Sequence, residues 1–270
     1  PLGYCGYGTI SDDTQQALAV CRGLIHGFRR GGQEEMLLDD VYSELRRWLL
    51  TQGEPAENRA PGATSLSALM GGVPGTIHKP VNESKSCGAV MRAHPIGIAF
   101  VDDATQAFLM GSKIGALTHG DVDGYAPSGA LAVMVAEIMN GAEIKEAVKK
   151  SLETLERLTP KAKSTAYWLS RAMIQKPGSD IGLNGRALGW DGDEALAMGV
   201  YAALSFPDDL VKACSFASIH DGDSDSVASI TGALVGTARG RQAVPKPWDE
   251  KLEHALELRQ RAEELLDLRR

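Results

Sequence analysis

Two short acidic segments, more than 200 residues apart, carry the side chains best suited to chemistry. Residues 11–14 read Ser-Asp-Asp-Thr, and residues 221–226 read Asp-Gly-Asp-Ser-Asp-Ser. Each segment precedes a run with helical periodicity, so the simplest interpretation is N-capping, because Ser, Thr and Asp oxygens accept hydrogen bonds from free N–H groups. Acidic residues in a first turn also suit the helix dipole.

The second segment offers more oxygen atoms than a cap requires. A cap uses one side chain, yet residues 221–226 supply three carboxylates and two hydroxyls, with no lysine or arginine within four residues. Such a cluster repels itself unless a cation joins it. Oxygen ligands without cysteine favour a hard cation such as Mg²⁺ or Mn²⁺, and the EF-hand pattern is absent. The two segments share one site only if the fold brings two helix starts together, which spacing alone does not establish.

Helical periodicity dominates the elements that must position these segments. Apolar residues recur at i, i+3, i+4 and i+7, and no β-alternation of useful length or internal repeat occurs. The pattern predicts helices over 14–29, 35–51, 88–100, 103–117, 125–140, 143–158, 161–174, 190–204, 207–218, 226–239 and 248–268. Gly- and Pro-containing stretches predict loops over 53–63, 72–86 and 175–189. We therefore expect an all-α fold, with residues 1–270 forming a single compact helical domain.

Composition restricts the partners and the compartment. The chain of 270 residues has a formal net charge of -7, which gives no general attraction to nucleic acid or to anionic membranes. Its four cysteines form no C-x-x-C pair, so zinc and thioredoxin-like chemistry are not expected. No apolar stretch has membrane-spanning length and no signal peptide is visible. We expect a cytoplasmic protein with reduced thiols.

Six segments, taken in order, make the chain similar to the ADP-ribosylglycohydrolases. The acidic segments resemble that family's T/S-D-D-T and G-G-D-S/T-D-S/T stretches. Residues 59–62 resemble its R-A-P-G loop, residues 86–92 its G-C-G-A-A-M-R segment, residues 117–119 its T-H motif and residues 189–196 its G-W-x-x-E-E-A-L helix. The resemblance extends over about residues 8–240.

This resemblance implies an orthogonal helical bundle that hydrolyses the bond between ADP-ribose and a modified protein side chain. It also implies two Mg²⁺ (or Mn²⁺) ions, with ligands Ser11, Asp12, Asp13, Asp223, Asp225 and Ser226. Asp12, Asp13 and Asp225 are the implied catalytic carboxylates. The C-G-A-x-M-R form of residues 87–92 and the H-x-G-D-S-D-S form of residues 220–226 favour arginine as the acceptor. ADP-ribosylated protein is then the partner and ADP-ribose the product.

The diphosphate of ADP-ribose needs N–H and O–H donors, and a loop that enters a helix start provides them. The expected substrate-binding residues are Gly62, Ser84, Ser86, Cys87, Gly88 and His119. We expect Cys87 to be a small packed residue. Arg92 could pair with phosphate, but a structural role is favoured, and Trp190 could stack on adenine, but packing in the core is favoured.

Two departures from the family pattern keep alternatives open. Asp221 stands where the family usually has glycine, which adds a carboxylate beside the site. The Gly-rich first helix and its following glutamate are not in the sequence, so we expect a natural N-terminal segment upstream of Pro1. The alternatives are another acceptor (serine or a small molecule), a two-metal phosphohydrolase acting on nucleotides, and a binding protein without turnover. All six implied ligand positions keep an oxygen, which argues against the last.

Overall fold

The computed structural model describes residues 7–268, and regular structure in this part of the chain is helical. The first half contains α1 (Asp12–Arg29), α2 (Glu34–Thr51), α3 (Ala63–Met70), the 3-10 helix η1 (Cys87–Arg92), α4 (His94–Ala99), α5 (Ala104–Ala116) and α6 (Val122–Met139). The second half contains α7 (Ile144–Leu158), α8 (Lys163–Ile174), α9 (Gly192–Ser205), α10 (Leu210–Ser218), α11 (Ser224–Arg239), η2 (Arg241–Ala243), α12 (Lys246–Lys251) and α13 (Ala255–Asp267). Within residues 7–268 the β pairing is a single antiparallel bridge between Ser86 and Asp191. The all-α prediction is confirmed.

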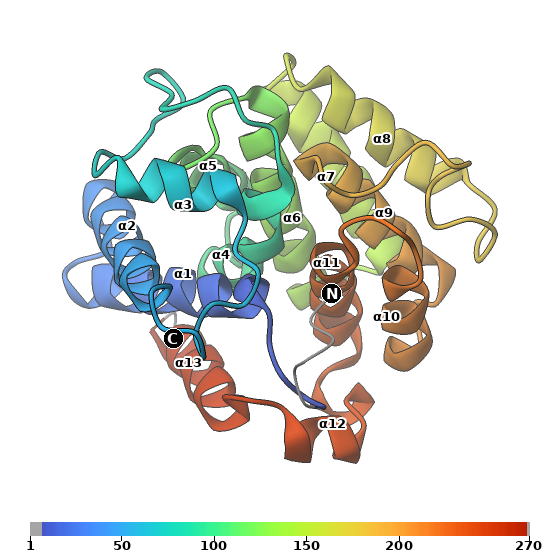
Figure 1. Ribbon diagram of the computed structural model, residues 1–270. Helices are drawn as coiled ribbons and strands as arrows, with labels where there is room; N and C mark the ends of the chain where they lie inside the picture. Colours follow the sequence, from blue (N-terminus) through green and yellow to red (C-terminus); the bar gives the residue numbers. More distant parts are fainter. Residues whose placement is uncertain (1–6, 269–270) are drawn as a thin grey trace.

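Helix α6 occupies the middle of the molecule, with α4, α5, α7 and α9 packed around it (Figure 1). Most residues of α6 are buried, which explains its largely apolar sequence. Small residues bring its backbone close to α5: a Cβ placed on Gly111 would lie 2.7 Å from the Cα of Gly129. This central helix gives the surrounding helices one common core.

Helices α1 and α2 form a hairpin beside this centre, and α13 packs against α1 (Figure 1). Leu18, Cys21, Leu24 and Ile25 form a buried face of α1, as expected for a helix with apolar residues at i, i+3, i+4 and i+7. Two ion pairs, Arg22–Glu257 and Arg29–Glu264, join α1 to α13. The first turn of α1 therefore projects from a well-supported helix.

Three predicted segments differ from the structure. The segment predicted as one helix over 88–100 is divided into η1 and α4. The segment between the first two predicted loops forms α3, for which periodicity gave no signal over so short a length. The predicted terminal helix over 248–268 is broken into α12 and α13, because Glu253 leaves the helix to accept a hydrogen bond from Ile10 N and to pair with Arg59.

Two further expectations concern the thiols and the membrane. Cys21, Cys87 and Cys214 are free thiols, and Cys5 lies outside the described residues. Among the helices described here, none combines the length and the hydropathy that crossing a membrane requires.

Candidate active site

A cavity of about 1000 Å³ opens where five separate segments meet. Its lining comes from the start of α1, the loop 60–62 with the start of α3, the loop that leads into η1, the bridge at residues 190–191, and the loop 220–226. The volume lies at the upper end of the range typical of small-molecule sites. All five segments belong to, or directly follow, the motifs that define the sequence pattern.

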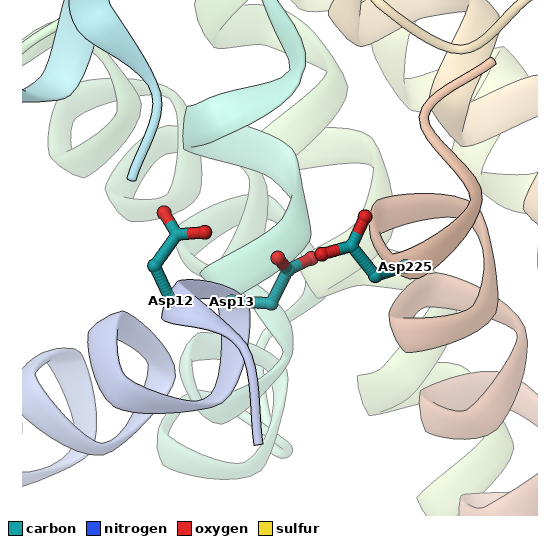
Figure 2. A group of neighbouring side chains, drawn as sticks. All are labelled: Asp12, Asp13 and Asp225. Carbon is teal, nitrogen blue, oxygen red and sulfur yellow. The ribbon is translucent and has the colours of Figure 1, made fainter. Parts of the chain in front are cut away.

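The two acidic segments converge at this cavity. Carboxylate oxygens of Asp12 and Asp13, in the first turn of α1, and of Asp225, in the first turn of α11, all lie within 4.8 Å of one another. Figure 2 shows the Asp13 and Asp225 carboxylates pointing toward each other from the two helices. The fold thus brings together the helix starts that sequence spacing left separate, and the group could hold a metal ion.

Asp12 is held by three hydrogen bonds at the beginning of α1. Its backbone N–H donates to the carbonyl of Arg59 over 3.2 Å. Its Oδ2 accepts from Nε2 of Gln16, one turn later in α1, over 2.7 Å. The backbone N–H of Gly62 donates to the same carboxylate. The loop carrying Arg59 and Gly62 therefore fixes one carboxylate of the cluster, and Ala60 within it adopts a left-handed backbone with φ of 62°.

Asp13 is buried beside Asp12 with one oxygen left over. Its Oδ2 accepts from the Ser11 hydroxyl over 3.0 Å. Its Oδ1 is inaccessible to solvent and has no hydrogen-bond partner among the described residues. An orphaned, buried carboxylate oxygen is rare in folded proteins, because leaving it unsatisfied costs about 1–3 kcal/mol. A cation bound among the carboxylates would satisfy this atom.

The start of α11 is arranged differently. Asp225 is exposed, whereas Oδ2 of Asp223 accepts a hydrogen bond from the Cys87 thiol over 2.7 Å. The Ser226 hydroxyl is buried and contacts Sγ of Cys87 at 3.6 Å and Sδ of Met91 at 3.4 Å. Among the implied metal ligands, then, Asp223 and Ser226 face sulfur atoms in this structure.

Burial and mutual repulsion both raise the pKa values of Asp12, Asp13 and Asp223. Burial is the main cause that raises the pKa of Asp12 to about 7 and the pKa of Asp223 to about 6. Burial together with the neighbouring carboxylates raises the pKa of Asp13 well above its ordinary range. Carboxylates gathered at this density favour a positive ion in their midst. The oxygen-only donor set and the unsatisfied Asp13 oxygen fit a hard divalent cation.

A neutral polar wall lines the cavity beside the acidic cluster. Gly62, Ser86, Cys87 and Gly88 line the cavity, as do Thr64 and Ser65 from the first turn of α3. Ser84 and His119, which the sequence predicted to bind substrate, are not among the residues that line the cavity. Each forms a hydrogen bond with the Ser86 hydroxyl, at 3.2 Å and 3.0 Å respectively. Burial lowers the pKa of His119 to about 3, so this imidazole is neutral.

A side chain at Gly88 would crowd this wall. A Cβ on Gly88 would lie 3.0 Å from Oγ of Ser65 and 3.2 Å from the ring of His119. The Ser65 hydroxyl is buried and has no hydrogen-bond partner among residues 7–268. The wall thus contains a polar recess that an added methyl group would fill.

The structure corrects one sequence-based role and refines two. Trp190 does not pack in the core: its side chain is 56% exposed and lines the cavity, because the bridge at residues 190–191 places it at the surface. Cys87 is a buried thiol whose pKa is raised well above normal by burial, which agrees with a packing role and not with a nucleophile. Arg92 is buried and does not line the cavity.

Sequence reasoning missed Gln16 and Ser65. Gln16 lies four residues after Asp12 in a helix, and side chains at i and i+4 are neighbours, so this contact was open to prediction. Ser65 lies on the helix that periodicity did not detect, and nothing in the sequence marked it as a wall of the cavity.

The whole chain matches one protein family. The family model described as ADP-ribosylglycohydrolase matches residues 1–270. An uncharacterized protein of Archaeoglobus fulgidus is 28% identical over 284 residues, covering 99% of this chain and 83% of that protein. A solved structure described as an ADP-ribosylglycohydrolase-related protein complex matches with a TM-score of 0.66 at 21% identity, covering 97% of this chain and 82% of that chain, and so shares the fold.

Proposed function

Because the chain belongs to the ADP-ribosylglycohydrolase family, we propose that it hydrolyses the N-glycosidic bond between ADP-ribose and a modified arginine side chain, with two Mg²⁺ or Mn²⁺ ions as cofactor. One observation carries the proposal. Carboxylates from α1 and α11 meet within 4.8 Å at a cavity large enough for a nucleotide sugar.

The proposed metal ligands are the oxygen-bearing side chains of the two acidic segments: Ser11, Asp12, Asp13, Asp223, Asp225 and Ser226. The unsatisfied Oδ1 of Asp13 and the crowding of carboxylates around it support this assignment. Divalent cations supply Lewis-acid chemistry in such sites, because they polarise oxygen atoms and lower the pKa of water. Ser226 would have to release its sulfur contacts to serve as a ligand.

The carboxylates of the cluster also act on the reacting sugar. Cleavage of the C–N bond leaves positive charge on the ribose ring, and nearby carboxylates stabilise such charge. Asp12 and Asp13 are held on α1 by hydrogen bonds from Gln16 and Ser11, so their direction is set before the substrate arrives. We assign to these two residues the orientation of the attacking water and the acceptance of its proton.

The diphosphate is proposed to bind the neutral wall. Among the described residues that line the cavity there is no lysine or arginine, so phosphate oxygens must rely on N–H and O–H donors and on the cofactor. The first turn of α3 provides backbone N–H groups without helical partners at Ala63 to Ser65, which favours an anion. Ser86, Gly88 and the groups behind them, Ser84 and His119, complete this wall. A phosphohydrolase would be expected to place cationic side chains here.

The acceptor end is proposed to bind a guanidinium group. Asp221 is exposed and lines the cavity, next to the acidic cluster. Trp190 presents an exposed ring to the same cavity, and its loop is tied to that of Asp221 by the hydrogen bond from Asp223 N to Leu188 O of 2.8 Å. Carboxylates and indole faces both attract planar cations. This rim favours arginine over a neutral acceptor.

Release of ADP-ribose from an arginine-modified protein tests the function. We expect release with Mg²⁺ or Mn²⁺, none with chelator, and none from Asp12→Ala or Asp225→Ala. Asp39→Ala, on the exposed side of α2, is the matched control and should keep full activity. Release only from a serine-modified protein would contradict the acceptor, release of inorganic phosphate would favour the phosphohydrolase, and ADP-ribose binding without release would indicate a binding protein.

A further inference from the structure

Arg92 is a fully buried cation, and no carboxylate among residues 7–268 forms an ion pair with it. It ends η1, is 1% exposed, and its hydrogen bonds go to two neutral side chains: Oε1 of Gln16 and, over 2.6 Å, Oγ1 of Thr118. A buried charge with neutral partners is expensive to hold in a fold. Leu or Met would fill the same space at lower cost, so packing does not account for arginine here.

The first contact of Arg92 leads to the acidic cluster. A guanidinium donates and never accepts hydrogen bonds, so Gln16 must turn its carbonyl oxygen toward Arg92. The amide group of Gln16 is then forced to face the other way, where it donates to Oδ2 of Asp12 over 2.7 Å. Arg92 therefore fixes the orientation of the Gln16 amide, so that Asp12 accepts a hydrogen bond from an N–H donor.

The second contact leads to the neutral wall. Thr118 accepts from Arg92, and of its two partners only Nδ1 of His119, at 2.8 Å, can take the hydroxyl proton. Nδ1 is then an acceptor, so the neutral ring carries its proton on Nε2 and donates to Ser86 over 3.0 Å. The Ser84 hydroxyl donates to the same oxygen over 3.2 Å. With two donors on its oxygen, Ser86 must point its own O–H into the cavity it lines.

We propose that Arg92 is a positioning residue that sets the hydrogen-bond direction at both ends of the site, through Gln16 to Asp12 and through Thr118 and His119 to Ser86. It thereby presents an ordered carboxylate to the cation and a hydroxyl donor to an anionic or hydroxyl oxygen of the substrate. This inference rests on the proposed function, since it assumes that the cation and ADP-ribose bind at these two ends.

Single substitutions distinguish the two arms of this network. The first arm leads through Gln16 to Asp12, and the second leads through Thr118 and His119 to Ser86. Gln16→Glu keeps an acceptor for Arg92 but removes the donor to Asp12. We expect Mn²⁺ affinity, measured by calorimetry, to fall about 10- to 100-fold, as for other residues that orient metal ligands, while metal-free ADP-ribose affinity stays within about twofold. Thr118→Val breaks the other arm. It should weaken ADP-ribose about tenfold, as loss of an ordered donor does, and leave Mn²⁺ affinity unchanged; Thr118→Ser should restore binding.

Two further measurements exclude a purely structural role. The ¹⁵N resonances of His119 should show a proton on Nε2 in the wild type, and Arg92→Met should abolish that preference while Arg92→Lys, which keeps a donor-only cation, preserves it. Apo-protein melting temperatures show which variants remain folded. If Gln16→Glu and Thr118→Val weakened both ligands in step with melting temperature, or if wild-type His119 carried its proton on Nδ1, the inference would be overturned. A wild-type protein that binds neither ligand would instead overturn the proposed function.

Discussion

The starts of α1 and α11 supply carboxylates to the same group, yet the protein supports them in different ways. Asp12 and Asp13 are buried and tied to Gln16 and Ser11 by hydrogen bonds. Asp225 is exposed, and Ser226 next to it contacts sulfur atoms. One half of the site is therefore ordered by a polar network, and the other lies against thiol and thioether groups.

This difference indicates that the two helices contribute to the site in different ways. A polar network with directional bonds fixes where carboxylate oxygens point before a ligand binds. Sulfur contacts are weak and easily exchanged, so Asp223, Ser226 and the exposed Asp225 can turn toward a ligand at small cost. We infer that α1 provides the fixed half of the site and α11 the half that adjusts.

The largest effect is expected from exchanging the central carboxylates for amides. Asp13→Asn should lower metal-dependent ADP-ribose release about 1000-fold, and Asp225→Asn about 100-fold, because a buried charge contributes more than an exposed one. Removing one of three crowded carboxylates should also raise the metal-free melting temperature of Asp13→Asn by several degrees, with no such rise for Asp225→Asn. Equal activity losses and equal melting temperatures for Asp13→Asn and Asp225→Asn would contradict the distinction between the two halves.

Two histidines that the fold holds neutral, His94 and His119, oppose the stabilisation that acid gives through the carboxylates with raised pKa values, Asp12, Asp13 and Asp223. Burial lowers the pKa of His94 to about 4 and that of His119 to about 3, from an ordinary 6.5. The unfolded chain binds the histidine protons first, so the histidine contribution to the free energy of unfolding should drop by up to about 3 kcal/mol per histidine as the pH falls from about 6.5 to about 4. The folded chain binds the carboxylate protons first, so the carboxylate contribution should rise over the same range.

Urea unfolding of the wild type and of histidine variants at several pH values isolates the histidine contribution. The difference in free energy of unfolding between the wild type and His94→Gln should fall by up to about 3 kcal/mol as the pH goes from about 6.5 to about 4, whereas the difference for the exposed His78→Gln should not change with pH. A pH-independent difference for His94→Gln would contradict the role given to this histidine.

Most of the scaffold was open to prediction from the sequence, because its helices carry strong apolar periodicity. The predicted helix over 35–51 lies within one residue of α2, and the all-α class follows from such segments. Tertiary contacts account for the failures. The break between α12 and α13 exists because Glu253 binds Arg59, a residue almost 200 positions earlier, and no local pattern encodes that partner.

The site shows the same division between local and tertiary information. Residue types and order indicated the two acidic segments, and helix spacing alone would have paired Asp12 with Gln16. Their meeting with Asp225, the burial of Arg92 between two arms, and the exposure of Trp190 depend on how helices pack. Periodicity places a residue on a face of its own helix and leaves open which other segment covers that face.

A smaller effect is expected at Cys87, whose thiol contacts Asp223 and Ser226 at the start of α11. Cys87→Ala removes the donor to Asp223 and leaves a small void, so the free energy of unfolding should fall by about 1–2 kcal/mol. Cys87→Ser keeps a donor and should lose less. The half-buried Cys214→Ala serves as the control for loss of a thiol elsewhere. A larger loss for Cys87→Ser than for Cys87→Ala would show that the hydrogen bond to Asp223 does not stabilise the fold.

The smallest effect is expected at the rim, where the adjustable half meets the acceptor. Trp190→Ala and Asp221→Asn should each raise KM for arginine-modified protein about two- to fivefold and leave kcat unchanged, since exposed cation–π and ion-pair contacts are each worth at most about 1 kcal/mol. Trp190→Phe should keep most of the affinity. The Asp221 effect should shrink in high salt, whereas the Trp190 effect should persist. Because both contacts require a cationic acceptor, an equal rise in KM for a substrate with a neutral acceptor would show that the rim does not select arginine.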